Sequence, residues 1–452
     1  MTTIQVTAQP EYAAQQLTIT ATETLTAITR SDANGVGEVR TLPGILPYTP
    51  TLAEVGRNYI TNPSFELGTA AWTPTRSTAS RYDFNSSSYW DGKAVGRYGL
   101  RLVSDAATGT SFVQSDAITI TPGQWAAAQL RGSASTVRWA VGIMFYNGTT
   151  WLAESYAAVM PAASVYALTA STHSAQAPAT ATNYRVIYRL YGAAGEAVPP
   201  AASTGYLDAV MAVKAATQAA ALAAVADPFD GDRAGDTRAY SWAGAAHASE
   251  SIAKAPTADL VLTDYEAASG AVSYTAGNAT RATSWAIPGP WLMVPTMPAY
   301  SVELETLLEY SAGGQSLGSV HELLGRNDPV AILRGMGTRR GTLRLYCGTF
   351  AQALTVAEAT KRGEVLMLRQ PEHEGMDMYF VATSYGIPTL DTNGGASVFG
   401  LDVSYVEVTR PVGALSGTLG WTFAALASSY PSFASLPGAY ATFQDALLNE
   451  PK

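Results

Sequence analysis

The sequence has little of what marks a secreted, membrane-bound or nucleic-acid-binding protein. Cys347 is the only cysteine, which excludes an intrachain disulfide, and its strand-like surroundings predict a small core residue. Charged residues make up only 14%, and the net charge of −9 argues against a nucleic-acid partner. No apolar run is long enough to cross a membrane, and the opening MTTIQVTAQPEY lacks the features of a secretion signal. We therefore expect synthesis in a cytoplasm, no membrane insertion and no nucleic-acid specificity.

What the chain does contain is a long series of short β-strands. Apolar residues make up 47%, enough for packed cores, while Ser, Thr, Ala and Gly take the place of surface charge. From about residue 56, apolar strands recur at roughly ten-residue spacing between Gly and Pro turns, which predicts a sandwich or jelly roll. Residues 15–45 also predict strands, with Asn34–Gly35 as a hairpin signal. The dense basic stretch at 334–344 is interpreted as a solvated or subunit-facing strand.

The first strand series resembles jelly-roll carbohydrate-binding modules, which open with N-x-x-x-N-P-S-F-E … W and close with Y-x-D-x-V. The matching residues are Asn58, Asn62, Pro63, Ser64, Phe65, Glu66 and Trp72, then Tyr206, Asp208 and Val210. In such a sandwich the first and last strands lie side by side, and two partly buried anions need a cation or strong donors. The resemblance implies a structural calcium at Glu66 and Asp208. Two ordinary solvated carboxylates are the alternative.

If the jelly roll binds sugar, aromatic side chains would stack on the rings and polar groups would bind the hydroxyls. The candidates are Tyr82, Tyr89, Trp90 and Trp151, because SSSYWDGK and YNGTTWLAE look like exposed loops. The alternative is that these aromatics belong to the core or to an apolar rim. Trp72 and Trp139 are expected in the core.

The stretch DPFDGDRAGD at 227–236 contains four aspartates, but their spacing does not fit a calcium loop. Asp-Pro, Asp-Gly and Gly-Asp pairs instead predict turns at a seam between domains. The wider segment resembles minor tail proteins of tailed phages that infect actinobacteria, which carry F-D-G-D … Y-x-W-x-G-x-x-H-A-S-x-S after a jelly roll. The residues that fit are Phe229, Asp230, Gly231, Asp232, Tyr240, Trp242, Gly244, His247, Ala248, Ser249 and Ser251.

The remaining segments complete a mainly β, multi-domain plan. Residues 286–412, with a helix in AQALTVAEATKR, resemble the belt domain of siphophage distal tail proteins, whose copies pair into a ring. Phe423, Phe433 and Phe443 recur every ten residues, as in the aromatic tails of such proteins. We predict an interrupted N-terminal β-sandwich (1–52 and 255–285), an inserted jelly roll (53–226), a connector (227–254), a distal-tail-like β domain with one helix (286–412) and an aromatic-repeat tail (413–452).

No catalytic constellation is evident. GQSLG at 314–318 matches the G-x-S-x-G pattern, but a nucleophile elbow needs an α/β sheet around it, and His321 is too close to Ser316 to be its usual partner. Both His-Glu pairs, at 321 and 373, lack the second histidine of H-E-x-x-H. We therefore expect no enzyme.

The sequence predicts a virion protein, a structural component of a phage tail tip. Its expected partners are further copies of itself in a trimeric or hexameric ring, other phage tail proteins and host cell-wall polysaccharide. Two alternatives remain: a jelly roll that serves only as scaffold for other tail subunits, and a tail-associated cell-wall hydrolase.

Overall fold

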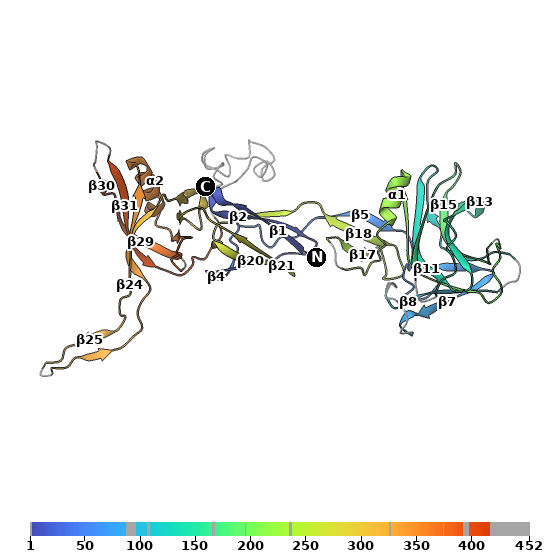
Figure 1. Cartoon of the computed structure of the whole chain (residues 1–452), viewed down its shortest axis with the longest axis horizontal. Coiled ribbons are helices and arrows are strands. Elements are labelled where there is room, and N and C mark those ends of the chain that lie inside the picture. Colours follow the sequence, from blue (N-terminus) through green and yellow to red (C-terminus); the bar gives the residue numbers. More distant parts are fainter. Residues whose placement is uncertain are drawn as a thin grey trace. The chain divides into compact units, whose positions relative to one another are not determined.

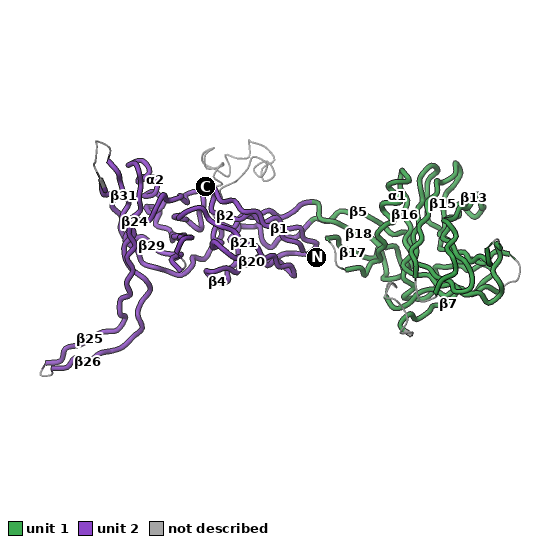
Figure 2. The backbone as a smooth tube through the Cα atoms, in the orientation of Figure 1, with its two compact units in different colours: residues 1, 51–257 green, residues 2–50, 258–452 purple. Residues whose placement is uncertain are grey.

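The computed structural model describes residues 2–86, 96–105, 109–164, 168–194, 196–234, 237–324, 327–373, 375–391 and 397–415. The predicted aromatic repeat, and with it Phe423, Phe433 and Phe443, lies outside the described residues. The fold is mainly β and multi-domain, as predicted (Figure 1). It divides into two compact units, residues 51–257 (unit 1) and residues 2–50 with the chain from 258 onward (unit 2) (Figure 2). Neither helix α1 (Gln218–Val225) nor helix α2 (Phe350–Lys361) has the length and apolarity to span a membrane.

Unit 1 contains two large antiparallel sheets that enclose one core. The six-stranded sheet comprises β13 (Thr150–Tyr156), β12 (Arg138–Asn147), β15 (Asn183–Tyr191), β9 (Ser111–Ser115) and β6 (Trp72–Thr75), with β10 (Ile118–Thr119) beside β15. The five-stranded sheet comprises β14 (Thr169–Gln176), β11 (Trp125–Ala134), β16 (Thr204–Ala215), β8 (Tyr98–Ser104) and β7 (Ser77–Asp83). The 3₁₀ turn η2 (Phe84–Ser86) follows β7.

Alternation along the strands determines which side chains enter this core. On β12 and β15 every second residue is buried in it: Trp139, Val141, Ile143, Phe145, Tyr184, Val186, Tyr188 and Leu190. Trp72 and Trp139 are both buried, which confirms their predicted place in the core. The intervening residues of β12 and β15 therefore face away from the core.

Residues 227–254, expected as a connector, belong to unit 1. They contribute to a small sheet of β17 (Ala239–Trp242), β18 (Ser251–Pro256) and β5 (Leu52–Asn58). Helix α1 packs with this segment, because Ala221 and Val225 share a cluster with Phe229 and Ala253. The Thr257 amide donates to the Thr51 carbonyl at 2.9 Å, so the two ends of unit 1 lie side by side.

Unit 2 begins with strands from both sides of this insertion. One sheet consists of β1 (Thr2–Gln9), β2 (Ala14–Ala21) and β19 (Leu260–Asp264), and η1 (Pro10–Tyr12) joins its first two strands. The other consists of β21 (Ala279–Trp285), β20 (Gly270–Ala276), β3 (Ile28–Asp32) and β4 (Gly35–Glu38). The predicted Asn34–Gly35 turn joins β3 to β4, and Gly35 has a φ of 102°, which favours glycine.

The rest of unit 2 is an eight-stranded sheet with helix α2. Its strands are β23 (Val302–Glu303), β22 (Trp291–Met293), β28 (Leu366–Arg369), β29 (Met378–Gly386), β31 (Val398–Glu407), β27 (Arg340–Cys347) and β24 (Leu307–Gly313), with β30 (Thr389–Asp391) beside β31. The turn η3 (Pro298–Tyr300) precedes β23, and β25 (Ser319–His321) and β26 (Val330–Ile332) form a separate two-stranded sheet among the described strands. The helix confirms the one predicted here, and Thr349 and Gln352 form a capping box at its start. Cys347 is buried, as predicted, and burial raises the pKa of its thiol.

Buried charges connect the two separated parts of the sandwich. Arg30 Nη1 lies 2.9 Å from Asp264 Oδ1, and Arg40 Nε lies 3.3 Å from Glu266 Oε2. Glu266 also accepts hydrogen bonds from Arg410 Nη2 at 2.6 Å and from the Tyr379 hydroxyl at 2.9 Å. Burial would raise the pKa of Glu266, but the hydrogen bond from Arg410 and the surrounding guanidinium charges hold it below its usual value.

We expect Glu266→Gln to destabilise the protein by about 3–5 kcal/mol at neutral pH, because it leaves buried guanidinium groups without their counter-charge. The folded carboxylate has a lower pKa than the unfolded one, so its stabilisation is present above about pH 4.3 and is lost as the pH falls through the folded pKa. The difference from wild type should therefore shrink between pH 7 and pH 3 in denaturant titrations. Glu38→Gln, at an exposed position, is the matched control and should change neither the free energy of unfolding nor its dependence on pH. A pH-independent difference for Glu266→Gln would contradict this account.

Candidate functional site: an aromatic and arginine face on unit 1

The predicted sugar-binding aromatics do not form one site. Trp151 lies on β13, an edge strand of the six-stranded sheet, and is 55% exposed. Tyr82 lies on β7, an edge strand of the other sheet, and packs edge-on against Phe84 and Tyr206 at centroid distances of 5.7 and 4.9 Å. Tyr89 and Trp90 lie outside the described residues. Of the four candidates, Trp151 is the one that the structure places on an open sheet face.

Strand register brings other residues to the same face as Trp151. Tyr146 on β12 is its cross-strand partner, and Gly142 pairs with Tyr156. The outward positions of β15 add Arg185, Arg189 and Tyr191. We call these residues the aromatic–arginine face: Tyr146, Trp151, Tyr156, Arg185, Arg189 and Tyr191.

At one part of this face, Arg185 is held between a ring and a backbone carbonyl. Its guanidinium carbon lies 5.7 Å from the centroid of the Tyr146 ring, and its Nη1 donates to the Ser115 carbonyl at 2.9 Å. The Tyr146 hydroxyl donates to Gln114 Oε1 at 3.3 Å. Cation–π contact and hydrogen bonding therefore orient both side chains, and no ion pair to Arg185 occurs among the described residues.

Further along β15, Arg189 lies between two tyrosine rings. Its guanidinium carbon is 4.5 Å from the Tyr191 centroid and 5.2 Å from that of Tyr156, and the two rings meet edge to face at 85°. The acid nearby is Glu154, whose Oε1 is 3.9 Å from Arg189 Nη1 and whose Oε2 accepts the Tyr156 hydroxyl at 3.3 Å.

Tyr156 lies flat on the sheet because its cross-strand partner is glycine. A Cβ at Gly142 would lie 2.3 Å from Tyr156 Cδ1, so a larger residue would displace the ring. Burial raises the pKa of Tyr156 to about 12, against a smaller opposing effect of Arg189, and burial also raises the pKa values of Tyr146 and Tyr191. All three hydroxyls are therefore protonated donors at neutral pH.

The proposed calcium ligands have contacts of their own. Glu66 Oε1 accepts the backbone amides of Arg97 at 2.7 Å and Tyr98 at 3.0 Å, which supplies the donors that a partly buried anion needs. Asp208 is fully buried on β16, opposite Arg131, at a bulge where Ala209 has a φ of 51°. Within the described ranges, no three His, Cys, Asp or Glu side chains group as metal ligands. Calcium at Glu66 and Asp208 stays a prediction.

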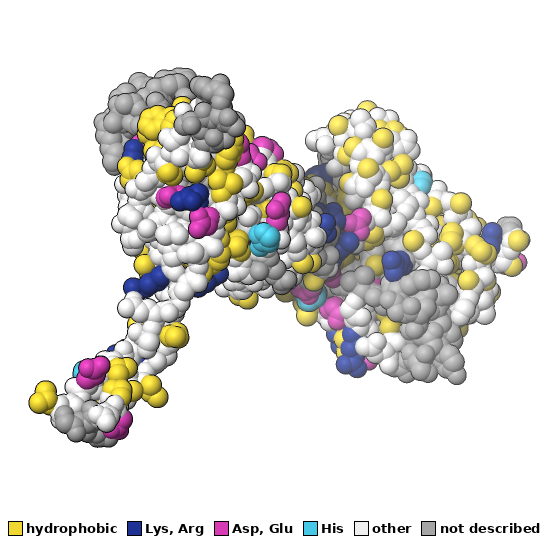
Figure 3. Space-filling view, turned by 60° about the vertical axis from the view of Figure 1, so that its left-hand side comes forward, with side chains coloured by type: hydrophobic (Ala, Val, Ile, Leu, Met, Phe, Trp, Pro, Cys, Tyr) yellow, Lys and Arg dark blue, Asp and Glu magenta, His cyan; other side chains and the backbone are white. Residues whose placement is uncertain are grey.

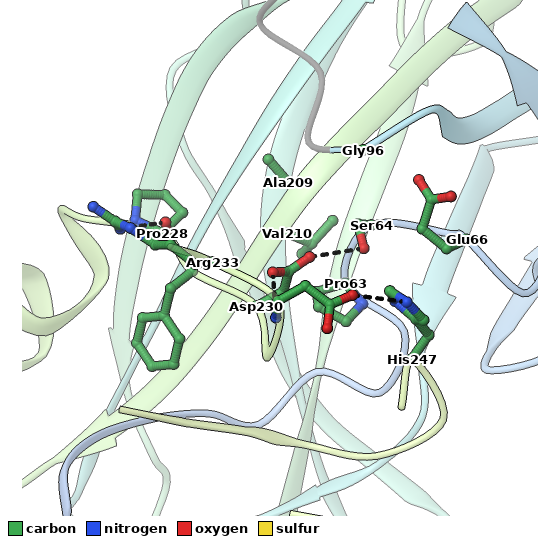
Figure 4. A pocket seen from close by; sticks show the side chains of 12 residues that line it. Pro63, Ser64, Glu66, Gly96, Ala209, Val210, Pro228, Asp230, Arg233 and His247 are labelled. Carbon is green, nitrogen blue, oxygen red and sulfur yellow. Dashed lines mark hydrogen bonds and ion pairs between the residues drawn. The ribbon is translucent and has the colours of Figure 1, made fainter. Parts of the chain in front are cut away.

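The seam lines a pocket of about 540 Å³ beside the start of the jelly roll (Figure 4). Asp230 accepts the Ser64 hydroxyl at 3.1 Å with one carboxylate oxygen and the Asp232 amide at 3.1 Å with the other. Asp232 in turn accepts Trp242 Nε1 at 2.9 Å and lies 2.9 Å from His247 Nε2. Glu66 also lines the pocket, but its carboxylate points away from Asp230. The residues of the seam motif thus bond to one another and to Ser64 of the N-P-S-F-E motif.

The G-x-S-x-G pattern falls on an exposed hairpin of unit 2, residues 314–336, which we call the arm. Ser316 Oγ accepts the Gly318 amide at 3.1 Å, and Ser319 Oγ lies 3.0 Å from His321 Nε2. The stretch around Ser316 is an exposed β-ribbon, whereas a nucleophile elbow lies between a buried strand and a helix.

The arm extends beyond β24 and β27 without packing on the body of unit 2 (Figure 1). Every described residue in it except Gly318 is exposed. Its apolar side chains share this exposure (Figure 3): Leu317, Val320, Leu323, Leu324, Val330, Ile332, Leu333 and Met336. The arm is therefore a second candidate for an interaction surface.

No protein-family model matches this chain, and no curated protein sequence matches it. Among solved structures, the chain is similar to the enzymatically active domain of bacteriophage CBA120 tailspike protein 4, at 12% identity and a TM-score of 0.27, over 35% of this chain and 21% of that one. It is also similar to TmCBM61 in complex with β-1,4-galactotriose, at 14% identity and a TM-score of 0.25, over 35% of this chain and 100% of that one. A Family 16 carbohydrate-binding module matches at 12% identity and a TM-score of 0.25, over 34% and 99%. This chain spans about a fifth of the tailspike structure's length.

Sequence reasoning missed most of the aromatic–arginine face. The usable signal was the alternation in NYRVIYRLY, which places Arg185, Arg189 and Tyr191 opposite the buried residues of the same strand. That pattern shows which residues share a face of one strand. It does not show that β12 and β13 add Tyr146, Trp151 and Tyr156 beside them, since strand order is a property of the folded chain.

We expect Asp230→Ala to destabilise unit 1 by about 1–3 kcal/mol, because the buried Ser64 hydroxyl loses its acceptor. Asp227→Ala is the matched control from the same stretch. Asp227 pairs with Arg233 and Arg238 at the surface, and its loss should change stability by about 0–1 kcal/mol. Calorimetric unfolding of the two variants tests the prediction, and equal effects would contradict the structural role of Asp230.

Proposed function

We propose that the protein is a structural component of a phage tail tip that assembles with further copies of itself and presents unit 1 for binding to host-surface glycans. The resemblance of the seam motif to actinophage minor tail proteins supports the virion role. The observation that carries the assembly role is the arm.

The arm gains little stability from its own contacts and exposes apolar surface. An isolated two-stranded ribbon is marginally stable in water, and the arm's apolar side chains remain in solvent on the single chain. Contiguous exposed apolar surface of this kind marks a protein–protein interaction site. A partner that covers the arm would stabilise both its pairing and its apolar contacts.

A second copy of the chain is the partner that we propose for the arm. The arm continues the ladder of β24 and β27, and β24 is an edge strand of the eight-stranded sheet. An edge strand presents unpaired backbone groups that another chain can pair with. Each copy thus offers both an arm and an edge strand, and a head-to-tail contact between two such different surfaces can close into a ring of three or six copies.

The aromatic–arginine face supports glycan binding by unit 1. Exposed Trp151 and the neighbouring Tyr146 offer ring surfaces, while Gln114 and the tyrosine hydroxyls offer hydrogen-bonding groups. Binding of a glycan without its hydrolysis needs no catalytic group at this face. Under the alternative in which unit 1 is only scaffold, the same face would contact other tail subunits; a cell-wall hydrolase is a weaker alternative.

We expect the purified full-length chain to show, by native mass spectrometry, three or six times the 47.4 kDa chain mass. The double variant Leu324→Ser/Leu333→Ser should weaken self-association by about tenfold or more, since it removes apolar surface that becomes buried between copies. At a dilution at which both proteins are monomeric, its thermal unfolding should match wild type, because these side chains are exposed on the single chain.

The control for the arm is Val36→Ser/Val261→Ser, which alters exposed apolar residues elsewhere in unit 2. It should leave the assembly unchanged. A monomeric wild type, or an arm variant that assembles normally, would count against self-assembly through the arm.

For the glycan role, we expect Trp151→Ala to weaken adsorption to isolated actinobacterial cell-wall polysaccharide by about tenfold, the loss of one ring-stacking contact. Folding should be unaffected, since Trp151 is 55% exposed. Tyr12→Ala, which removes an exposed aromatic of unit 2, is the matched control. Unchanged adsorption of Trp151→Ala would favour the scaffold alternative, and release of reducing sugar from the wall material would favour the hydrolase.

A further inference from the structure

We infer that the aromatic–arginine face is selective for anionic polysaccharides, whose carboxylate or phosphate groups pair with Arg185 and Arg189 while sugar rings stack on Trp151 and Tyr146. This inference rests on the proposed glycan binding by unit 1 and adds the chemical class of the glycan.

The first support is that Arg185 has no acidic partner within salt-bridge distance among the described residues. Its contacts are the Ser115 carbonyl at 2.9 Å and the Tyr146 ring. A guanidinium has five N–H donors, and the carbonyl uses one of its nitrogens. The other donors of a side chain already held in place are available for a bidentate pair with a carboxylate or phosphate.

The second support is the orientation of Arg189. Its guanidinium lies between Tyr156 and Tyr191, and its side chain is 12% exposed. Glu154 forms a long ion pair with it, at 3.9 Å. Two tyrosine rings that hold the arginine reduce the conformational entropy lost when a ligand binds. A neutral sugar would gain little from such a guanidinium, whereas an anionic group would gain a charge-assisted hydrogen bond.

The local charge balance agrees with an anionic ligand. The whole chain has a net charge of −9, yet this face carries Arg185 and Arg189 against Glu154. Arg138, which pairs with Tyr191 in the strand register, adds a third guanidinium at the end of the face, bound to the carbonyls of Gly192, Ala193 and Glu196. Glu196, whose carboxylate accepts the Ala193 amide, is the acid at this end, so three arginines stand against two glutamates. The face is thus locally positive on an acidic protein.

The spacing of the arginines indicates a polymer and not a single sugar. Arg185 and Arg189 are four positions apart on β15, which corresponds to about 13 Å along the strand. Trp151 and Tyr146 lie beside the Arg185 part of the face, while Tyr156 and Tyr191 flank Arg189. Anionic groups on different sugars of one chain would meet the two guanidinium groups.

The test compares binding of the full-length protein to polygalacturonate, to its fully methyl-esterified form and to a glycerol-phosphate teichoic acid. The first two probes share a backbone and differ in charge, and the third replaces carboxylate with phosphate. We expect polygalacturonate or the teichoic acid to bind about tenfold more tightly than the ester, with affinity that falls as salt is raised. Whichever anion binds more tightly identifies carboxylate or phosphate as the preferred group.

The double variant Arg185→Gln/Arg189→Gln should lose about tenfold in affinity for the anionic probe and most of the salt dependence. Arg185→Lys/Arg189→Lys should lose less, because it keeps the charge but not the planar fork. Arg101→Gln, an exposed arginine on the five-stranded sheet, is the control and should bind as wild type.

Two results would overturn the inference. If the ester binds as tightly as the acid and Trp151→Ala weakens both, the face binds neutral glycan, and the proposed function survives without the charge selectivity. If no probe binds and cell-wall polysaccharide is not adsorbed either, the proposed glycan role fails along with the inference.

Discussion

The fold of unit 2 depends on buried ion pairs that join segments far apart in the sequence. Arg30 and Asp264 are separated by 234 positions, and Arg40 and Glu266 by 226, yet both pairs are buried in the same sandwich. Either charge alone in that interior would be strongly unfavourable, so the strands before and after unit 1 stabilise each other only when both are in place. The first and last residues of unit 1, Thr51 and Thr257, are hydrogen-bonded to each other. Because its ends lie together, a whole domain can be inserted between two strands of the sandwich without separating them.

Within unit 1, hydrogen-bond satisfaction separates residues that maintain the fold from residues available to a ligand. Asp230 and Asp232 belong to a stretch of four aspartates that predicts turns at a seam, and in the structure their oxygens accept hydrogen bonds from Ser64, a backbone amide and Trp242. Arg185 shows the opposite pattern, because the Tyr146 ring and the Ser115 carbonyl orient it, while its charge has no acidic partner among the described residues. The aspartate-rich motif thus stabilises the fold at the seam, whereas β15, which carries no recognised motif, supplies the arginines of the candidate site.

The arm adds a different kind of constraint. Its strands β25 and β26 pair with each other through three residues each. Nothing in unit 2 covers its apolar side chains among the described residues, so the arm carries apolar surface that a partner could cover. The proposed glycan contact and the proposed self-association use residues of different units, so substitutions can test each proposal separately.

The sequence by itself determined the local features of this protein: its mainly β class, helix α2 with the Thr349 capping box, the turn at Gly35, and the burial of Trp72, Trp139 and Cys347. These depend on periodicity, capping and turn chemistry, which act over a few residues. The tertiary structure alone decided that Trp151 and Tyr82 belong to different sheets, that Trp151 shares a face with Arg185, and that the G-x-S-x-G segment lies on an exposed arm. The physical reason is that a binding face collects one or two residues from each of several strands, and their neighbours are set by strand order and register between distant segments.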